Sequence, residues 1–242
     1  MDIKEIEGQA RLRHLQACVF PILAEQGDSA GVHGSALLFR REDHHYAVTA
    51  THVAKYLETH AEVMSAPSAS HVGLTDAWSL GRGTLAKTAE EEEDVSVFRL
   101  EEAGVVERLR AGGHVFLCND DVEPLPQASS TCGVFGWPAA GARQVDRVVH
   151  GKAVAMLLAR LAPPPGSRPT DIFLEWPSVD DVPDLAGISG SPIWAVSEAS
   201  GVWHPSKEIK LVGVQHSIRR SDWIRGTSWS VVNKLIDRVS GR

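Results

Sequence analysis

Short apolar runs separated by turn residues dominate this sequence and restrict the folds open to it. Residues 34–39, 46–50 and 94–100 are rich in valine, leucine, alanine and aromatic side chains, and polar or glycine-containing segments separate them. Strands of this length with regular turn signals are typical of antiparallel sandwiches and barrels. The same rhythm fills the second half of the chain, with candidate strands at 114–118, 131–136, 147–158, 171–176, 191–196, 210–216 and 227–231. We therefore expect an all-β fold.

Helical spacing is found mainly near the two ends of the chain. Residues 3–16 and 231–239 place apolar side chains three and four positions apart, which predicts a helix in each segment. Shorter helical pieces are expected at 51–57 and 101–111. A strand is expected over 18–24, and its Pro21 indicates a sheet edge or a bulge.

Charge and composition exclude several classes of partner. The 242 residues fit one large β unit or two small domains, and 43% hydrophobic content is enough for a core. The net charge of −7 gives no support for a nucleic-acid partner. The sequence has no run of about 18 apolar residues, so we expect no membrane span.

The termini and the cysteines point to the cytoplasm. The first seven residues are charged and lack the apolar centre of a secretory signal. Cys18, Cys118 and Cys132 are odd in number and widely spaced, so we expect small buried thiols and no disulfide framework. A reducing compartment fits this pattern.

The segment Gly187-Ile-Ser-Gly-Ser-Pro192 is the strongest candidate for chemistry. Glycine allows backbone conformations that a side chain forbids, so this loop can raise the Ser189 hydroxyl and turn successive N–H groups toward one point. Such an arrangement suits a nucleophile beside an oxyanion hole. A glycine- and serine-rich turn between two strands is the alternative.

A serine nucleophile needs a base and a carboxylate that orients the base. His52 follows the strand at 46–50, and Asp94 begins an alternating strand. The order is therefore histidine, aspartate, serine. An α/β-hydrolase esterase would place its histidine last and would have glycine at position 191, where this chain has Ser191.

These segments together resemble the trypsin-like (chymotrypsin-fold) serine proteases. Thr49-Ala-Thr-His52-Val is similar to the family's Thr-Ala-Ala-His box, and Asp94-Val-Ser-Val is similar to its Asp-Ile-Ala-Leu box. Gly187–Pro192 resembles the Gly-Asp-Ser-Gly-Gly-Pro box, and Gly34–Phe39 resembles the strand that precedes the histidine in bacterial members. The resemblance covers roughly residues 17–236.

The resemblance implies two six-stranded antiparallel β-barrels with short helices at the two ends. It divides the chain into an N-terminal helical extension at 1–16, a first barrel at 17–115 and a second barrel with a C-terminal helix at 116–242. The first barrel would contain His52 and Asp94, and the second would contain Ser189.

The activity that the resemblance implies is that of a serine endopeptidase acting on a peptide or protein without a cofactor. His52 would be the base and then the acid, Asp94 would hold its ring, and Ser189 would attack the carbonyl. Backbone N–H groups of Gly187 and Ser189 would form the oxyanion hole. The alternative is a peptide-binding module on the same fold with little or no turnover, which Ile188 and an unclear pocket favour.

Departures from the family pattern refine these expectations. Ile188 stands where secreted trypsins have an aspartate that pairs with a new N-terminus, so activation of that kind is not expected. With no disulfides expected, the chain looks more like intracellular bacterial members. An uncontrolled protease in the cytoplasm would harm its host, so we suspect control by a regulatory protein partner.

The residues that would select the substrate are less clear from the sequence. Asp184 would favour arginine or lysine, and His216 would favour an acidic side chain, if either lined the family's primary pocket. A solvated Asp184 and a buried strand residue at position 216 are the alternatives. His44 and His45 lie at a polar hairpin tip without further ligands at suitable spacing, so we expect no metal site there.

Overall fold

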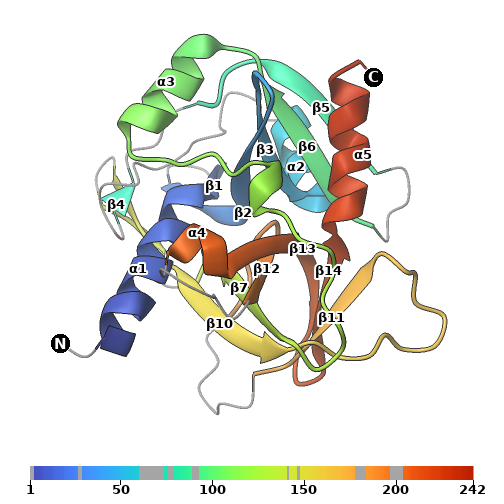
Figure 1. Cartoon of the computed structure of the whole chain (residues 1–242). Coiled ribbons are helices and arrows are strands. Elements are labelled where there is room, and N and C mark those ends of the chain that lie inside the picture. The colour runs from blue at the N-terminus through green and yellow to red at the C-terminus, as the bar shows by residue number, and fades with distance from the viewer. Residues whose placement is uncertain are drawn as a thin grey trace.

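The computed structural model describes most of the chain, and its strands form two large antiparallel sheets with helices around them (Figure 1). The described residues are 3–26, 29–59, 74–75, 79–88, 93–140, 142–145, 148–177, 184–196 and 204–241. The expectation of an all-β fold is confirmed. The proposed division of the chain at residues 16 and 115 stays a prediction.

The first sheet has five strands in the described residues, rather than the six of the expected barrel. Their order is β1 (Val19–Gln26), β2 (Ser29–Arg41), β3 (His44–Ala50), β6 (Val95–Leu100) and β5 (Gly83–Lys87). β1 pairs only with β2 within this sheet and therefore forms its edge. Pro21 can occupy β1 because an edge strand leaves one row of N–H groups outside the ladder.

The second sheet has six strands. Their order is β10 (Val154–Ala159), β7 (Thr131–Gly136), β12 (Pro192–Val196), β13 (Ile209–Arg219), β14 (Trp223–Ser228) and β11 (Asp171–Glu175). An antiparallel bridge between Arg160 and Leu174 joins the ends of the two outer strands. The sheet thus curves toward closure, which reduces the unpaired edge that an open sheet would expose.

A small third sheet joins segments that are distant in the sequence. It contains β4 (Leu74–Thr75), β9 (Val148–His150) and β8 (Arg143–Val145). The single strand that the sequence indicated at 147–158 is two strands, because the chain leaves β9 at residue 150 and enters β10 at residue 154. The strand expected at 114–118 is an isolated bridge between Leu117 and Phe39.

Helices lie around the sheets, and the first and last of them lie at the two ends of the chain (Figure 1). They are α1 (Ile3–Cys18), α2 (Thr51–Thr59), α3 (Ala103–Ala111), the 3₁₀ turn η2 (Asn119–Asp121), α4 (Pro205–Glu208) and α5 (Trp229–Val239). α5 packs against β5 and β6 of the first sheet. The Tyr46 hydroxyl hydrogen bonds to that of Ser240 at 2.7 Å, just beyond the end of α5. None of the described helices has the length and apolar character needed to cross a membrane.

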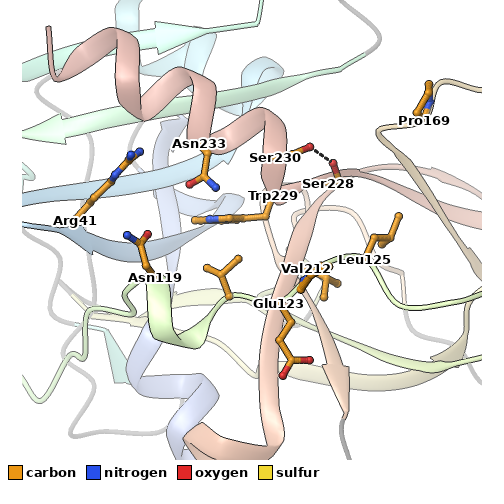
Figure 2. Close-up of a pocket in the computed structure, with 12 residues that line it drawn as sticks. Arg41, Asn119, Glu123, Leu125, Pro169, Val212, Ser228, Trp229, Ser230 and Asn233 are labelled. Carbon is orange, nitrogen blue, oxygen red and sulfur yellow. Dashed lines mark hydrogen bonds between the residues drawn. The ribbon is translucent and has the colours of Figure 1, made fainter. Parts of the chain in front are cut away.

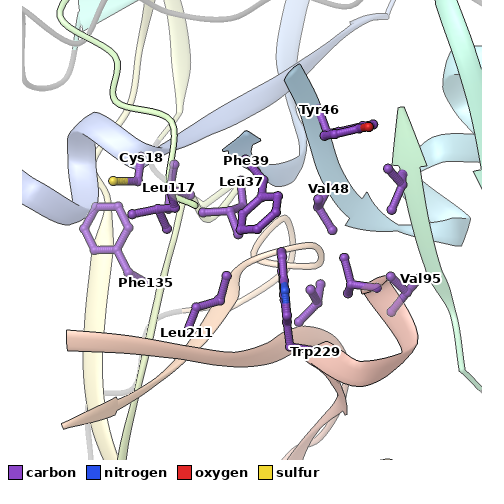
Figure 3. Close-up of a cluster of buried hydrophobic side chains, with 14 of the residues drawn as sticks. Cys18, Leu37, Phe39, Tyr46, Val48, Val95, Leu117, Phe135, Leu211 and Trp229 are labelled. Atoms are coloured by element: carbon purple, nitrogen blue, oxygen red, sulfur yellow. The ribbon is translucent and has the colours of Figure 1, made fainter. Parts of the chain in front are cut away.

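Both faces of the central strands are buried, which explains why their sequences are almost continuously apolar. Along β2, Leu37 and Phe39 join a cluster between the sheets, whereas Ala36 and Leu38 join a cluster inside the first sheet. Residues alternate between the two faces of a strand, so one strand serves two cores. Figure 3 shows the cluster between the sheets, where Trp229 of α5 lies near Phe39 at a ring distance of 4.8 Å.

The loop before β12 lies tightly against the first sheet at Gly190. Gly190 has a φ of +91°, and a Cβ there would collide with the Ser35 carbonyl oxygen and the Thr49 hydroxyl. Ser35 lies on β2 and Thr49 on β3, and both side chains are buried. Only glycine therefore allows this loop to lie against the first sheet.

We expect Gly190→Ala to lower the free energy of unfolding by about 3 kcal/mol or more, because it adds a steric clash to a strained φ. Gly166→Ala is the matched control, since Gly166 also has a positive φ, of +83°, but has open space around it. Urea unfolding of both variants measures the difference. Equal losses in the two variants would contradict this account of the contact between the sheets.

Candidate active site

Asp94 and His52 meet where β3 ends and β6 begins. The antiparallel register pairs Ala50 with Val95, which brings the residue before β6 beside the first turn of α2. The Thr51 N–H donates to the Asp94 carbonyl at 2.9 Å, and the His52 N–H donates to Asp94 Oδ1 at 2.9 Å. The carboxylate therefore accepts from the first turn of a helix, where an anion is favoured.

The second carboxylate oxygen fixes the imidazole ring. His52 Nδ1 lies 2.6 Å from Asp94 Oδ2. An ionised carboxylate only accepts hydrogen bonds, so Nδ1 carries the proton and the neutral ring keeps Nε2 as its basic nitrogen. Asp94 has a φ of +44°, a region that is sparsely occupied by residues other than glycine. The His52 side chain is 48% exposed, so its free nitrogen is accessible.

The Ser189 loop presents two unoccupied N–H groups. Gly187 has a φ of +94°, and a Cβ there would lie 2.7 Å from the Ala139 nitrogen. Within the loop, Ile188, Gly190 and Ser191 donate their N–H groups to backbone carbonyls. In the described part of the chain, the N–H groups of Gly187 and Ser189 donate to no protein acceptor. These two N–H groups are therefore available to donate to a ligand oxygen.

Ser35, which the sequence analysis did not identify, holds this loop in place. Its N–H donates to the Ser189 carbonyl at 2.8 Å, and its hydroxyl donates to the Gly187 carbonyl at 3.2 Å. The same hydroxyl accepts the Trp137 N–H at 2.9 Å. The available signal was a small polar residue within the apolar run at 34–39. Nothing in the sequence named its partners, which lie more than 100 positions away.

Gly34 lies against both the residue that follows His52 and the backbone of Ser189. A Cβ at Gly34 would lie 2.5 Å from the Val53 side chain and 3.1 Å from the Ser189 carbonyl oxygen. The residue after His52 and the backbone of Ser189 thus face the same point on β2. Among the described residues, the Ser189 hydroxyl has no hydrogen-bond partner, so it makes no hydrogen bond to the His52 ring in this conformation.

A pocket of about 270 Å³ opens beside Ser189. Its walls are Trp176, Asp184, Leu185, Ala186, Ser189, Ile218 and Arg220. Asp184 Oδ1 accepts the Ala186 N–H at 3.1 Å, so one of its oxygens is used within its own turn. Asp184 and Arg220 are both exposed, and they place opposite charges around apolar walls.

His216 does not line this pocket and faces the candidate catalytic residues from inside the protein. It is 4% exposed, and its Nδ1 lies 4.0 Å from Asp94 Oδ2. Burial lowers the pKa of His216 to about 4, with Asp94 opposing this shift and Arg225 adding to it. The imidazole is therefore neutral near pH 7.

The histidines at the hairpin tip contact arginines. His44 Nδ1 lies 3.3 Å from the Arg99 guanidinium, and His45 Nε2 lies 2.9 Å from that of Arg110. Arginine only donates, so these ring nitrogens accept and are occupied. No group of three or more metal-ligating side chains gathers among the residues that the structure describes.

A larger cavity, of about 600 Å³, contains none of the predicted site residues. It lies between the start of α5 and the segment 122–125, and Figure 2 shows Trp229 between the side chains of Asn119 and Asn233. The Trp229 indole N–H is buried without a partner in the described residues. The cavity contains no base beside a nucleophile, so the loop at Ser189 remains the candidate for chemistry.

Solved structures show which fold this is. The protease domain of MamO from Magnetospirillum magneticum matches 91% of this chain and 96% of its own length, with 12% sequence identity and a TM-score of 0.55. Human heparin binding protein matches 95% of this chain and 93% of its own length, with 14% identity and a TM-score of 0.60. These likenesses show that the chain has the chymotrypsin-like fold. No protein-family model and no characterised protein sequence matches the chain.

The buried neutral His216 predicts an acid-sensitive stability. An unfolded histidine binds its proton near pH 6.5, whereas His216 in the folded state binds it near pH 4. Between these values the unfolded state holds more protons, so the free energy of unfolding falls as the pH falls, by about 3 kcal/mol over the whole window. Above pH 6.5, His216 is neutral in both states and no longer changes the free energy of unfolding with pH.

Urea unfolding at pH 7, 5 and 4 measures this dependence, with His216→Gln as the comparison because glutamine does not titrate. We expect the wild type to lose more stability than the variant between pH 7 and pH 4. Parallel losses would show that other groups cause the acid sensitivity.

Proposed function

We propose that this protein is a serine endopeptidase with His52, Asp94 and Ser189 as its catalytic residues. The observation that supports this best is the pair of hydrogen bonds that Asp94 accepts from His52, one from the backbone N–H and one from Nδ1. The bond from Nδ1 sets the ring tautomer that a general base requires. The free N–H groups of Gly187 and Ser189 and the pocket beside Ser189 add support.

In the acylation step, Ser189 Oγ attacks the carbonyl carbon of the scissile peptide bond. Its proton passes to His52 Nε2, and the resulting imidazolium is stabilised by Asp94. The N–H groups of Gly187 and Ser189 donate to the oxyanion that forms on the carbonyl oxygen. The Ser189 hydroxyl, which has no partner in the described residues, turns toward Nε2 when substrate binds.

The C–N bond then breaks, and His52 returns the proton to the leaving amine. An acyl group remains on Ser189 as an ester. In deacylation, a water molecule gives one proton to His52 Nε2 and attacks the ester carbonyl. The acid product leaves, the proton returns to Ser189 Oγ, and the free enzyme is restored.

A peptide-binding module with little or no turnover is the second candidate. The observation that favours it is the missing hydrogen bond between Ser189 and His52. The net charge of −7 argues against a polyanionic ligand. The intracellular bacterial subtype, the cytoplasmic location and the regulatory partner stay predictions.

A fluorophosphonate probe tests the nucleophile directly, because it labels a serine only when a base activates the hydroxyl. We expect labelling of the wild type and none of Ser189→Ala. Asp94→Asn should label about 10³–10⁴ times more slowly, since the ring loses its fixed tautomer. Gel fluorescence and intact mass measure the labelled fraction.

Ser191→Ala is the matched control for this experiment. Its hydroxyl is fully buried and has no hydrogen-bond partner in the described residues, so labelling should match the wild type. Equal labelling of the wild type and Ser189→Ala would reject the assigned nucleophile. Tight peptide binding without labelling would favour the binding module.

The pocket beside Ser189 predicts a preference for uncharged side chains. Trp176, Leu185 and Ile218 supply apolar surface. A charged substrate side chain would be attracted by one of Asp184 and Arg220 and repelled by the other, so the two charges give it no net advantage. We expect Arg220→Ala to shift cleavage toward lysine and arginine, and Asp184→Asn to shift it toward acidic residues. Cleavage of a diverse peptide library, read by mass spectrometry, measures both shifts. An unchanged preference in both variants would place the selecting residues elsewhere.

A further inference from the structure

A chain of hydrogen bonds runs from the second sheet to the turn that carries Asp94. The Thr227 hydroxyl on β14 donates to the Glu93 carbonyl at 2.8 Å. His216 Nε2 on β13 lies 3.2 Å from the same hydroxyl oxygen. The Ser217 hydroxyl lies 2.8 Å from His216 Nδ1. Glu93 immediately precedes Asp94, so this chain ends beside the candidate catalytic carboxylate.

The direction of these bonds follows from the number of protons. The single hydroxyl proton of Thr227 goes to the Glu93 carbonyl, so the contact with His216 needs a proton on Nε2. In a neutral imidazole this leaves Nδ1 bare, and Nδ1 accepts from the Ser217 hydroxyl. Each donor in this series of hydrogen bonds is then matched by an acceptor.

A β-bulge places His216 in this position. The pairing of β13 with β14 shifts between Gln215 and Ser217, and His216 is the extra residue. A bulge redirects a side chain that would otherwise follow the strict alternation of the strand. Here it turns the ring inward, where the side chain is almost completely buried.

The unprotonated Nδ1 of His216 lies near Asp94 Oδ2, the oxygen that accepts the hydrogen bond from His52. His216 Nδ1 and His52 Nδ1 lie 4.0 Å and 2.6 Å from Asp94 Oδ2. The neutral His216 ring offers that oxygen no proton, so the hydrogen bond to His52 has no competitor from this side. The other charged groups acting on His216 are Arg225 and Asp171, which pair with each other at 3.0 Å.

We propose that His216 and Thr227 are positioning residues, which fix the strained Asp94 turn from the opposite sheet and leave the carboxylate to His52 alone. This proposal deepens the proposed endopeptidase function and rests on it for its catalytic consequence. The left-handed backbone at Asp94 costs energy, so it persists only where its surroundings hold it. Thr227 supplies that hold through the preceding carbonyl.

Thr227→Val tests the chain of hydrogen bonds with a residue of the same shape, and Thr227→Ser is its matched control. Valine removes the donor to the Glu93 carbonyl and the acceptor for His216, whereas serine keeps both. We expect Thr227→Val to slow fluorophosphonate labelling about 10–100-fold, by analogy with the range found for residues that orient metal ligands through a hydrogen bond. Thr227→Ser should label nearly as fast as the wild type.

A second pair of variants addresses the ring itself. His216→Gln keeps an N–H donor for Thr227, whereas His216→Leu removes it. We expect labelling to survive in the glutamine variant and to fall in the leucine variant. Thermal unfolding of each variant identifies any that fail to fold, and the Thr227 pair decides the question if His216→Leu is unstable.

Proton NMR reads the Asp94–His52 hydrogen bond without any turnover. The wild type should show a far-downfield Nδ1 proton, assigned to His52 by its absence from His52→Ala. This signal should persist in Thr227→Ser and disappear or broaden in Thr227→Val. An intact signal and full labelling in a folded Thr227→Val would overturn the proposal.

The two readouts separate this proposal from the proposed function. If the wild type is not labelled but the downfield proton depends on Thr227, the positioning role stands and the endopeptidase function falls. If the wild type is labelled and Thr227→Val changes neither readout, the function stands and the positioning role falls.

Discussion

The contact between the two sheets is the constraint on which the candidate site depends, because each sheet fixes the functional loop of the other. Ser35 of the first sheet binds the carbonyls of Gly187 and Ser189, and Thr227 of the second sheet binds the carbonyl of Glu93. Glycine at position 190 lets the surfaces approach closely enough for these bonds. Without this contact, nothing would hold the side chains of His52 and Asp94 in a fixed position relative to that of Ser189.

The fold could be predicted from the sequence largely because the strand patterns and the His, Asp and Ser segments are local. His52 and Asp94 could be proposed as partners because each stands at the boundary of a clear strand. Ser35 and Thr227 were missed for a physical reason. Their roles come from hydrogen bonds to backbone atoms that lie 102 or more positions away, and backbone N–H and carbonyl groups leave no mark on the sequence.

The two residues expected to select substrate illustrate the same limit. Asp184 lies in the pocket beside Ser189, but one of its oxygens is bound to its own turn. His216 is not among the residues that line this pocket, and it is the extra residue of a bulge in β13 that a strict two-residue alternation does not anticipate. Arg220, which offsets the charge of Asp184 in the pocket, stood in a polar turn without any motif around it.

Ile188 gives the Ser189 loop an anchor that does not depend on charge. Its side chain is 1% exposed and belongs to the apolar cluster of the second sheet with Leu185 and Ile193. Apolar burial of this kind holds at any ionic strength and any pH at which the sheet itself is folded. The loop geometry therefore forms together with the core of the second sheet, and the backbone around Ser189 takes its shape from apolar packing alone, without a charged partner for position 188.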